Sequence, residues 1–444
     1  MQMKPYPKYK DSGIEWIGEI PEGWESRRLR FNCKVNPTEQ IGVSNKKTKV
    51  TFLPMDRVSV DGEYDRESEA EYCEVSTGYT YFTNRDVLIA KITPCFENGK
   101  GCYVDNLTNN IGFGTTEFHV LRSHNNMNPE FILYFSRSHL FRIIGEAFMQ
   151  GAAGQKRIST DFTKDFRMPT PPKPEQREIA TFLDKKTSEI NDLIAKNKEL
   201  IELEKEKRVA LINHAVTKGL DTNVKLKDSG VEWIGEIPED WGIRKFSHIS
   251  KRISVGFVGS IEKHYTDETG IPLLKTGNIG NGEVLLNKLS YVTKEFHYAN
   301  VKSQLIPGDI IIARHGESGK SAVIAKMLKH ANCLNIVLLK VGSKMYGKYY
   351  SYLMNAHIFL EHLQAIQGGS VQGVINTEDI SQMKVIFLPK PEQEAIVEYL
   401  DKHTANIDKT IKKINKNIEL LEEYKQSLIH HVVTGKVDVR EIAA

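Results

Sequence analysis

The most constraining feature of this 444-residue chain is an internal repeat. The stretch KDSGIEWIGEIPEGW begins at Lys10, and KDSGVEWIGEIPEDW begins at Lys227, 217 residues later, with thirteen of fifteen positions identical. A repeat of this length predicts two structural copies. Three further pairs keep the same spacing: PPKPEQREIATFLDKKTSEI (171–190) and LPKPEQEAIVEYLDKHTANI (388–407), INHAVTKG (212–219) and IHHVVTGK (429–436), and MQGAAGQKRIST (149–160) and IQGGSVQGVINT (366–377).

The segments between these motifs differ almost completely. Residues 25–148 and 242–365 share little beyond RDVLIAKITPCFENGKG (85–101) and GDIIIARHGESGKS (308–321). Variable and constant segments therefore alternate along the chain. We predict globular domains at 1–173 and 220–390, long helices at 174–219 and 391–436, and a tail at 437–444.

Composition excludes several classes of protein. Hydrophobic residues make up 40% and charged residues 26%, as in soluble globular proteins. The sequence contains no run of about 18 apolar residues, so it predicts no membrane span. The N-terminus lacks the apolar core of a signal peptide, so we expect a cytoplasmic protein. The five cysteines include no C-x-x-C pair, which argues against a zinc site. A net charge of +3 is compatible with a nucleic-acid partner but does not indicate one.

Each constant segment predicts a long helix. It opens with P-K-P-E-Q and continues for about forty residues without Gly or Pro, a pattern in which proline and glutamate mark the first turn. Gly219 and Gly435 then provide stop signals. Forty helical residues form a rod of about 60 Å.

Residues in alternating steps of three and four define a mostly apolar stripe along each predicted helix, typical of a coiled coil. We call this stripe the seam. The polar Asn197 within it can set register. The two helices pair antiparallel within the chain, or each pairs with a helix of another chain; the first interpretation is the more economical. The predicted seam residues are Ile190, Ile194, Asn197, Ile201, Leu211, Ile407, Ile411, Ile414, Ile418, Leu421 and Leu428.

Both variable segments predict α/β or α+β domains, because short apolar runs alternate with Gly/Asn-rich turns and are followed by helical stretches. The predicted helical stretches are 129–148 and 346–365. The predicted strands are VLIAKI (87–92), EFHVLR (117–122), DIIIAR (309–314) and IVLLKV (336–341).

No motif in the sequence indicates catalysis by this chain. RHGESGKS (314–321) resembles a phosphate-binding loop, but Arg314 stands where that loop requires glycine. No Ser/His/Asp or Cys/His constellation stands out. His430 and His431 fit a helix end better than a metal site, so we expect no metal.

Three doubled motifs resemble the specificity (S) subunits of type I restriction–modification systems: W-I-G-E-I-P-E-x-W, Q-x-x-I-x-T near each domain's end, and P-K-P-E-Q-x-x-I before a long helix. The resemblance covers essentially the whole chain. It implies a non-catalytic subunit with two target recognition domains, each reading one half of a split, asymmetric double-stranded DNA site. The two helices would pack antiparallel and fix the gap between the half-sites.

The resemblance also implies protein partners. Two modification (M) subunits would carry the S-adenosylmethionine site, and restriction (R) subunits would bring ATP-driven translocation and cleavage. S-adenosylmethionine, ATP and Mg²⁺ would then belong to the partners, with no cofactor in this chain. An alternative is a two-domain coiled-coil scaffold without DNA sequence specificity. A nuclease or fused methyltransferase would need metal or cofactor motifs that we do not find.

Candidate DNA-contacting residues follow from the matched strand ends, where Lys91 and Arg314 precede Gly-rich loops. Arginine and lysine can bond guanine or phosphate. Gln155 and Gln372 match between domains that should read different sequences, so a structural or backbone-contact role is favoured for them. The full set of candidates is Lys91, Lys100, Gln155, Lys156, Arg157, Arg314, His315, Lys320 and Gln372. Four tryptophans are expected to be packing anchors between domain and helices rather than base-stacking platforms: Trp16, Trp24, Trp233 and Trp241.

Overall fold

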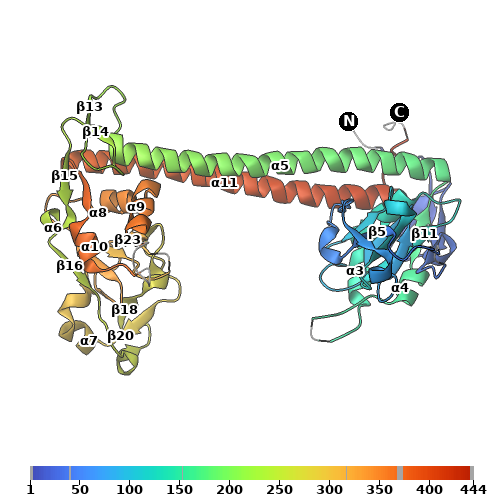
Figure 1. Cartoon of the computed structure of the whole chain (residues 1–444), viewed down its shortest axis with the longest axis horizontal. Coiled ribbons are helices and arrows are strands. Elements are labelled where there is room, and N and C mark those ends of the chain that lie inside the picture. Colours follow the sequence, from blue (N-terminus) through green and yellow to red (C-terminus); the bar gives the residue numbers. More distant parts are fainter. Residues whose placement is uncertain (1–3, 40–41, 153, 317, 368–373, 441–444) are drawn as a thin grey trace. The chain divides into compact units, whose positions relative to one another are not determined.

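The computed structural model describes residues 4–39, 42–152, 154–316, 318–367 and 374–440 (Figure 1). The chain divides into two compact units. Unit 1 consists of Met1–Asn197 and Asn415–Ala444, and unit 2 consists of Lys198–Ile414. Each unit thus contains one variable segment and part of both constant segments. Within the described ranges, no helix combines the length and apolar character needed to cross a membrane.

The variable segment of unit 1 contains a mixed sheet of order β6-β5-β10-β7 and an antiparallel sheet of order β4-β11-β8-β9. The central strand β8 is buried throughout, and its alternate residues enter two different hydrophobic clusters. The strands are β4 (Cys33–Val35), β5 (Lys49–Leu53), β6 (Glu69–Glu71), β7 (Thr80–Thr83), β8 (Asp86–Ala90), β9 (Gly101–Tyr103), β10 (Ile111–Gly114) and β11 (Phe118–Ser123).

The predicted helical stretch 129–148 is two helices rather than one. Buried Ser138 has extended backbone angles, and its hydroxyl accepts a hydrogen bond from the backbone N–H of Phe141. A serine in this geometry ends one helix and caps the next. The helices of this segment are α1 (Tyr72–Val75), α2 (Pro129–Arg137), α3 (His139–Ala147) and α4 (Thr160–Asp165).

The variable segment of unit 2 forms two five-stranded sheets, of orders β16-β25-β22-β23-β19 and β17-β20-β18-β24-β21. Their strands are β16 (Arg252–Val255), β17 (Tyr265–Thr266), β18 (Ile271–Leu274), β19 (Gly282–Glu283), β20 (Ser290–Val292), β21 (Gln304–Leu305), β22 (Ile310–Ile312), β23 (Ser321–Val323), β24 (Ala331–Cys333) and β25 (Val337–Lys340). The helices are α6 (Phe246–Ile249), α7 (Lys294–Ala299), α8 (Gly347–Asn355), α9 (His357–Gln367) and α10 (Thr377–Gln382). The fold class is thus mixed α/β in both units, as the sequence predicted.

Short two-stranded ribbons flank each variable segment at matching places. The opening motif forms β1 with β2 in unit 1 and β13 with β14 in unit 2, and a second ribbon joins the two ends of each domain. Their strands are β1 (Tyr9–Asp11), β2 (Glu19–Pro21), β3 (Glu25–Arg28), β12 (Arg167–Thr170), β13 (Leu226–Asp228), β14 (Glu236–Pro238), β15 (Gly242–Lys245) and β26 (Lys384–Phe387).

The two long helices are present, as predicted: α5 (Lys173–Lys218) and α11 (Lys390–Val433). Each helix starts at the lysine of its P-K-P-E-Q motif, one residue before the second proline. The glutamine of that motif locks the start in the same way in both units. Gln176 accepts a hydrogen bond from Asn128 N at 2.8 Å and donates one to Pro171 O at 2.8 Å. Gln393 accepts from Tyr346 N at 2.7 Å and donates to Leu388 O at 2.9 Å.

The glutamate of P-K-P-E-Q accepts a hydrogen bond from the indole N–H of the second tryptophan in the opening motif. Trp24 Nε1 donates to Glu175 at 3.1 Å, and Trp241 Nε1 donates to Glu392 at 3.0 Å. Both tryptophans are buried. In unit 1, Tyr6 adds a second donor to Glu175 at 2.6 Å, and burial together with this bond raises the pKa of the tyrosine. The two repeated motifs are therefore two halves of one contact.

The same tryptophans define how the helices pack. A Cβ placed on Gly435, just after α11, would lie 3.1 Å from the Trp24 ring, and one on Gly219, just after α5, would lie 3.3 Å from the Trp241 ring. Trp24 thus meets the start of α5 and the end of α11 within unit 1, and Trp241 meets the start of α11 and the end of α5 within unit 2. Segments of the two helices therefore pack antiparallel in each unit.

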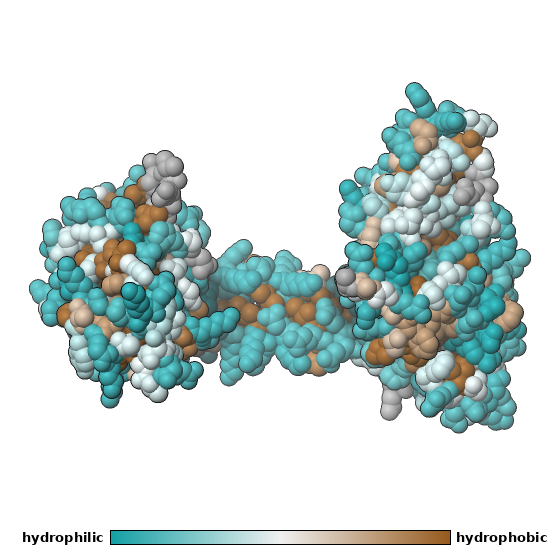
Figure 2. All heavy atoms as spheres, turned by 90° about the horizontal axis from the view of Figure 1, so that it is seen from below, coloured by the Kyte–Doolittle hydropathy of each residue, from teal (hydrophilic) through white to brown (hydrophobic). Residues whose placement is uncertain are grey.

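Every seam residue is buried or half-buried. In unit 1, Ile190 and Ile194 share a cluster with Leu428, onto which Ile418 and Leu421 pack. The amide of Asn197 donates to Leu193 O of its own helix at 3.0 Å, and its register-setting role stays a prediction. Figure 2 shows apolar side chains along the helices that remain uncovered. The large apolar side chains of α5 and α11 that are exposed are Leu193, Leu420 and Tyr424 in unit 1, and Leu200, Leu203 and Val209 in unit 2.

A cation interrupts the seam at matching positions of the two helices. In unit 2, Arg208 lies 2.6 Å from Asp408. In unit 1, the matching pair is Lys425 and Asn191, joined by a 2.8 Å hydrogen bond, and the carboxylate comes instead from Asp61 at 2.9 Å. Asp61 belongs to the variable segment, so the ion pair in unit 1 ties the domain to α11.

The indole–carboxylate contact makes a stability prediction. Substituting Trp24→Phe removes a donor from a buried carboxylate and shortens the ring, so we expect the free energy of unfolding to fall by about 2–4 kcal/mol. Urea unfolding followed by circular dichroism measures this change. The control Trp16→Phe, at a 49% exposed position, should change the free energy by less than about 0.5 kcal/mol. Equal effects of both substitutions would contradict the assignment.

Candidate nucleic-acid interface

The matched strand ends occupy equivalent places in the two domains. Ala90, the last residue of β8, donates its N–H to Lys100 O at 2.9 Å, and Ala313, just after β22, donates to Lys320 O at 2.9 Å. One residue further, Lys91 O accepts from Ile158 N at 2.9 Å, and Arg314 O accepts from Ile375 N at 3.1 Å. Different sequences thus share one backbone framework at this point.

In unit 1 the structure brings all five candidate residues together beside the end of β8. Lys91 and Lys100 flank the strand end, and Thr93 N donates to Lys156 O at 2.9 Å, which places the loop of Gln155 and Lys156 next to it. Gln155 and Lys156 are exposed, whereas Lys91 and Lys100 are half-buried.

Arg157 is held by the residue that precedes β11. Its guanidinium bonds Glu117 through two nitrogens, at 2.7 Å (Nη2–Oε1) and 2.9 Å (Nε–Oε2). This bidentate pair lowers the pKa of Glu117 and fixes the arginine in one orientation. Arg157 therefore presents a positioned cation at the edge of the loop, rather than a freely rotating one.

Unit 2 holds a different arginine at the equivalent place. Arg314 donates from Nε to Ile375 O at 3.1 Å and from Nη1 to Asn335 Oδ1 at 2.9 Å. The strand registers Phe118↔Ala90 and Val337↔Ile312 place Asn335 where unit 1 has Glu117. His315 is exposed beside Arg314, and Lys320 is half-buried. Gln372 lies outside the described residues.

Buried His119 supports the strand-end loop of unit 1 from beneath. It is 1% exposed; Nε2 lies 3.2 Å from Ile158 O and Nδ1 lies 3.0 Å from the Asn36 amide. Because the amide donates, Nδ1 accepts and Nε2 carries the proton that bonds Ile158 O. Burial lowers the pKa of His119 to about 4, so the ring is neutral at pH 7.

A second basic feature, which the sequence analysis missed, lies on the ribbons joining the domain ends. Arg28 stands opposite Arg167 across β3 and β12, and Lys245 stands opposite Lys384 across β15 and β26. Like charges in direct opposition destabilise a strand pair. Here Arg28 also lies 3.4 Å from Asp165, and Lys245 donates to Gln382 at 2.5 Å. The available signal was the 217-residue spacing of both basic positions.

The tryptophans fall into two classes. Trp24 and Trp241 join domain to helix through their bonds to Glu175 and Glu392. For Trp16 and Trp233 the anchor role stays a prediction. Trp16 packs on Phe166 of its own domain, with ring centroids 6.2 Å apart. Trp233 stacks on His362 at 5.0 Å and lines a groove with Ile366. Of the first tryptophans of the two motifs, Trp16 is exposed and Trp233 is half-buried.

These features define a doubled protein with two differently equipped α/β domains on a common pair of long helices. Residues 21–203 and 238–420 each match the family model described as the type I restriction modification DNA specificity domain. The chain therefore belongs to this family. Among the described residues, no group of three or more His, Cys, Asp or Glu side chains is arranged to hold a metal ion.

Curated relatives carry the same description. The chain is 40% identical over 183 residues to the type I restriction enzyme EcoEI specificity subunit of Escherichia coli, a match covering 40% of this chain and 30% of that protein. The match to the EcoAI specificity subunit of the same organism likewise covers 30% of that protein. The putative MjaX specificity subunit of Methanocaldococcus jannaschii is 25% identical over 437 residues, covering 96% of both chains.

Two solved structures share the fold. A chain from a structural study of "complex assembly and conformational transition of the type I R-M system" has a TM-score of 0.72 at 17% identity, covering 94% of this chain and 99% of that one. The HsdS subunit from Thermoanaerobacter tengcongensis has a TM-score of 0.60 at 16% identity, covering 94% and 98%. At these identities the likeness establishes the fold.

His119 makes a pH prediction. Its pKa in the folded chain is about 4, below the usual value near 6.5, so the unfolded chain takes up this proton first as the pH falls below about 6.5. Stability from this residue is complete above that pH and decreases toward pH 4, by about 2 kcal/mol at pH 5. Urea unfolding at pH 7.5 and 5.0 should therefore show a smaller loss for His119→Gln than for the unmodified chain.

The matched control for this experiment is His315→Gln, at an exposed histidine. It should retain the full pH dependence of the unmodified chain. If His119→Gln retains that dependence as well, His119 is not the group responsible.

Proposed function

We propose that this chain is the DNA-recognition subunit of a type I restriction–modification complex, reading a bipartite, asymmetric site with one half read by each domain. The observation that carries the proposal is that the ends of β8 and β22 have equivalent backbone hydrogen bonds but different side chains. Glu117 holds Arg157 in unit 1, whereas Asn335 holds Arg314 in unit 2. A common frame with exchanged donors suits two readers of two different base sequences.

The repeated basic ribbons supply the sequence-independent part of binding. Contacts to phosphate provide affinity and register, and they need not differ between half-sites. Arg28 and Lys245 match between the domains, as do Arg167 and Lys384, whereas the strand-end residues differ. Matching ribbon residues and differing loop residues are what we expect if the ribbons bind the phosphate backbone of DNA and the loops bind its bases.

The uncovered apolar residues of α5 and α11 provide surfaces for protein partners. Leucines exposed on a helix gain free energy when a second helix covers them. Two modification subunits would occupy these surfaces, one near each unit, and restriction subunits would join through them. S-adenosylmethionine, ATP and Mg²⁺ would reside in those partners, and this chain would perform no chemistry itself.

Selection from a random duplex pool tests the proposal, using the chain together with the partner with which it copurifies. We expect two short, unlike sequence blocks at fixed separation. The double substitution Gln155→Ala/Lys156→Ala should relax one block and His315→Ala the other, each weakening preference by roughly tenfold or more at the affected positions.

Lys416→Gln, a single charge removed from an exposed position of α11, is the control and should leave both blocks unchanged. A pool that yields no motif while the partner is bound would reject DNA recognition. The alternative of a two-domain scaffold without sequence specificity would then be favoured.

The long helices should set the gap between the blocks. Removing Lys198–Glu204 from α5 and Lys412–Ile418 from α11 deletes one heptad from each helix, between the Asn191–Lys425 and Arg208–Asp408 contacts, and keeps the seam in phase. The rod shortens by about 10 Å, so the selected gap should shrink by roughly three base pairs. An unchanged gap in the selected motif would exclude the ruler role.

A further inference from the structure

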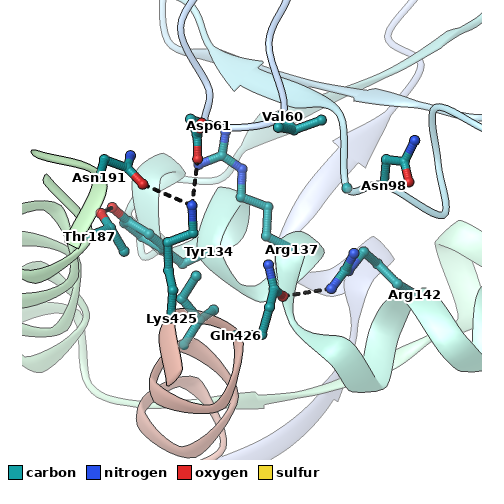
Figure 3. Close-up of a pocket in the computed structure, with 12 residues that line it drawn as sticks. Val60, Asp61, Asn98, Tyr134, Arg137, Arg142, Thr187, Asn191, Lys425 and Gln426 are labelled. Carbon is teal, nitrogen blue, oxygen red and sulfur yellow. Dashed lines mark hydrogen bonds and ion pairs between the residues drawn. The ribbon is translucent and has the colours of Figure 1, made fainter. Parts of the chain in front are cut away.

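A polar cavity lies within unit 1, where the first domain meets both long helices (Figure 3). Its volume is about 80 Å³. Side chains reach it from α2, α3, α5, α11 and two loops of the domain. The cavity is separate from the strand-end loops described above. The lining residues that matter here are Asp61, Asn98, Arg137, Arg142, Asn191 and Lys425.

The cavity is rich in positive charge. Arg137, Arg142 and Lys425 line it, against Asp61 as the carboxylate among its described lining residues. Lys425 points toward Asp61 and Asn191, so Asp61 is already paired. The two arginines have no carboxylate bonded to them in the described structure. Their acceptors are the carbonyls of Gly101 and Glu97 and the side-chain amide of Gln426.

Arg137 is the most unusual of these groups. It is 8% exposed, its Nη2 donates to Gly101 O at 2.9 Å, and its Nε has no hydrogen-bond partner among the described residues. Arg142 Nε is likewise buried without a partner. Burial lowers the pKa of both guanidiniums. Buried charges in proteins are normally paired. Both guanidiniums line the cavity and are bonded to neutral acceptors among the described residues, so the cavity lacks a counter-charge for them.

The backbone is shaped to hold Arg137 in this place. A Cβ on Gly62, whose φ is +92°, would lie 2.1 Å from Arg137 Nη2, so only glycine lets the loop after Asp61 close over the guanidinium. The Asp61 loop therefore covers the arginine and at the same time delivers its carboxylate to Lys425.

Size limits the ligand. A water-sized group needs about 10–15 Å³ of such volume, so the cavity has room for roughly five or six heavy atoms. A tetrahedral oxyanion has five. The surrounding amides of Asn98 and Asn191 add neutral donors that suit oxygen acceptors.

We propose that this cavity is a binding site for a phosphate-sized oxyanion, held by Arg137 and Arg142 and capped by Lys425. The anion is either free phosphate or the terminal phosphate of a larger molecule. Bound there, it joins the first domain to α11 through charge-assisted bonds. Unit 2 has no equivalent cation pair, because Asn355 and Leu360 stand at the matching helix positions, 218 residues after Arg137 and Arg142. The site therefore belongs to one half of the repeat alone.

Calorimetric titration of the full chain with inorganic phosphate, at pH 7 and constant ionic strength in chloride, tests this site. We expect one saturable site in the unmodified chain. Arg142→Gln removes a cation but keeps an amide, and it should weaken binding at least roughly tenfold. Lys416→Gln, the control for loss of one exposed charge on α11, should bind phosphate as the unmodified chain does. A parallel titration with ATP distinguishes free phosphate from a terminal phosphate.

ATP binding that depends on Arg142 assigns the site to a terminal phosphate, and binding of inorganic phosphate alone assigns it to the free ion. If Arg142→Gln does not fold, Asn98→Ala provides a milder variant at an exposed loop position and should weaken binding severalfold. An absence of saturable heat with both ligands, or equal affinities in the unmodified chain and these variants, would overturn the proposal.

Discussion

The hydrogen bond between a buried indole and a helix-start glutamate is the contact on which the rest of the structure depends. A carboxylate at a domain–helix junction is costly to bury unless donors meet it, and Trp24 and Trp241 are the donors. The negative charge also lies in the first turn of α5 or α11, where the helix dipole favours it. One contact thus fixes the start of a helix, the end of its antiparallel neighbour and the entry into the domain.

Because this contact occurs twice, the two units can diverge elsewhere without losing their frame. The divergence reaches the helices themselves. Asp408 bonds Arg208 across the helices of unit 2, whereas unit 1 has Asn191 at the matching place and takes its carboxylate from Asp61 of the domain. Lys425 is consequently tied to a loop of the variable segment. The position of the first domain on its helices therefore depends on residues that the second domain lacks.

The sequence predicted those parts of the fold in which both partners of a contact are repeated. The Trp–Glu and Gln–backbone contacts recur at one spacing, so the doubled architecture and both long helices could be inferred directly. The break at Ser138 could not, because one serine within an apolar stretch is a weak signal. Nor could the pairing of Arg157 with Glu117, since these residues are 40 positions apart and Glu117 lies in the divergent segment 25–148.

The same logic explains why the candidate DNA contacts cannot be transferred between domains. Ile158 and Ile375 fix both strand ends through backbone bonds, which are indifferent to side-chain identity. The residue before the next strand then selects which arginine is held: a carboxylate, Glu117, accepts two bonds from Arg157, whereas an amide, Asn335, accepts one from Arg314. The arginine itself also changes place between the copies, because Arg157 has Val374 opposite it and Arg314 has Lys91 opposite it. A recognition surface can therefore change its charge pattern while the strands beneath it keep their register.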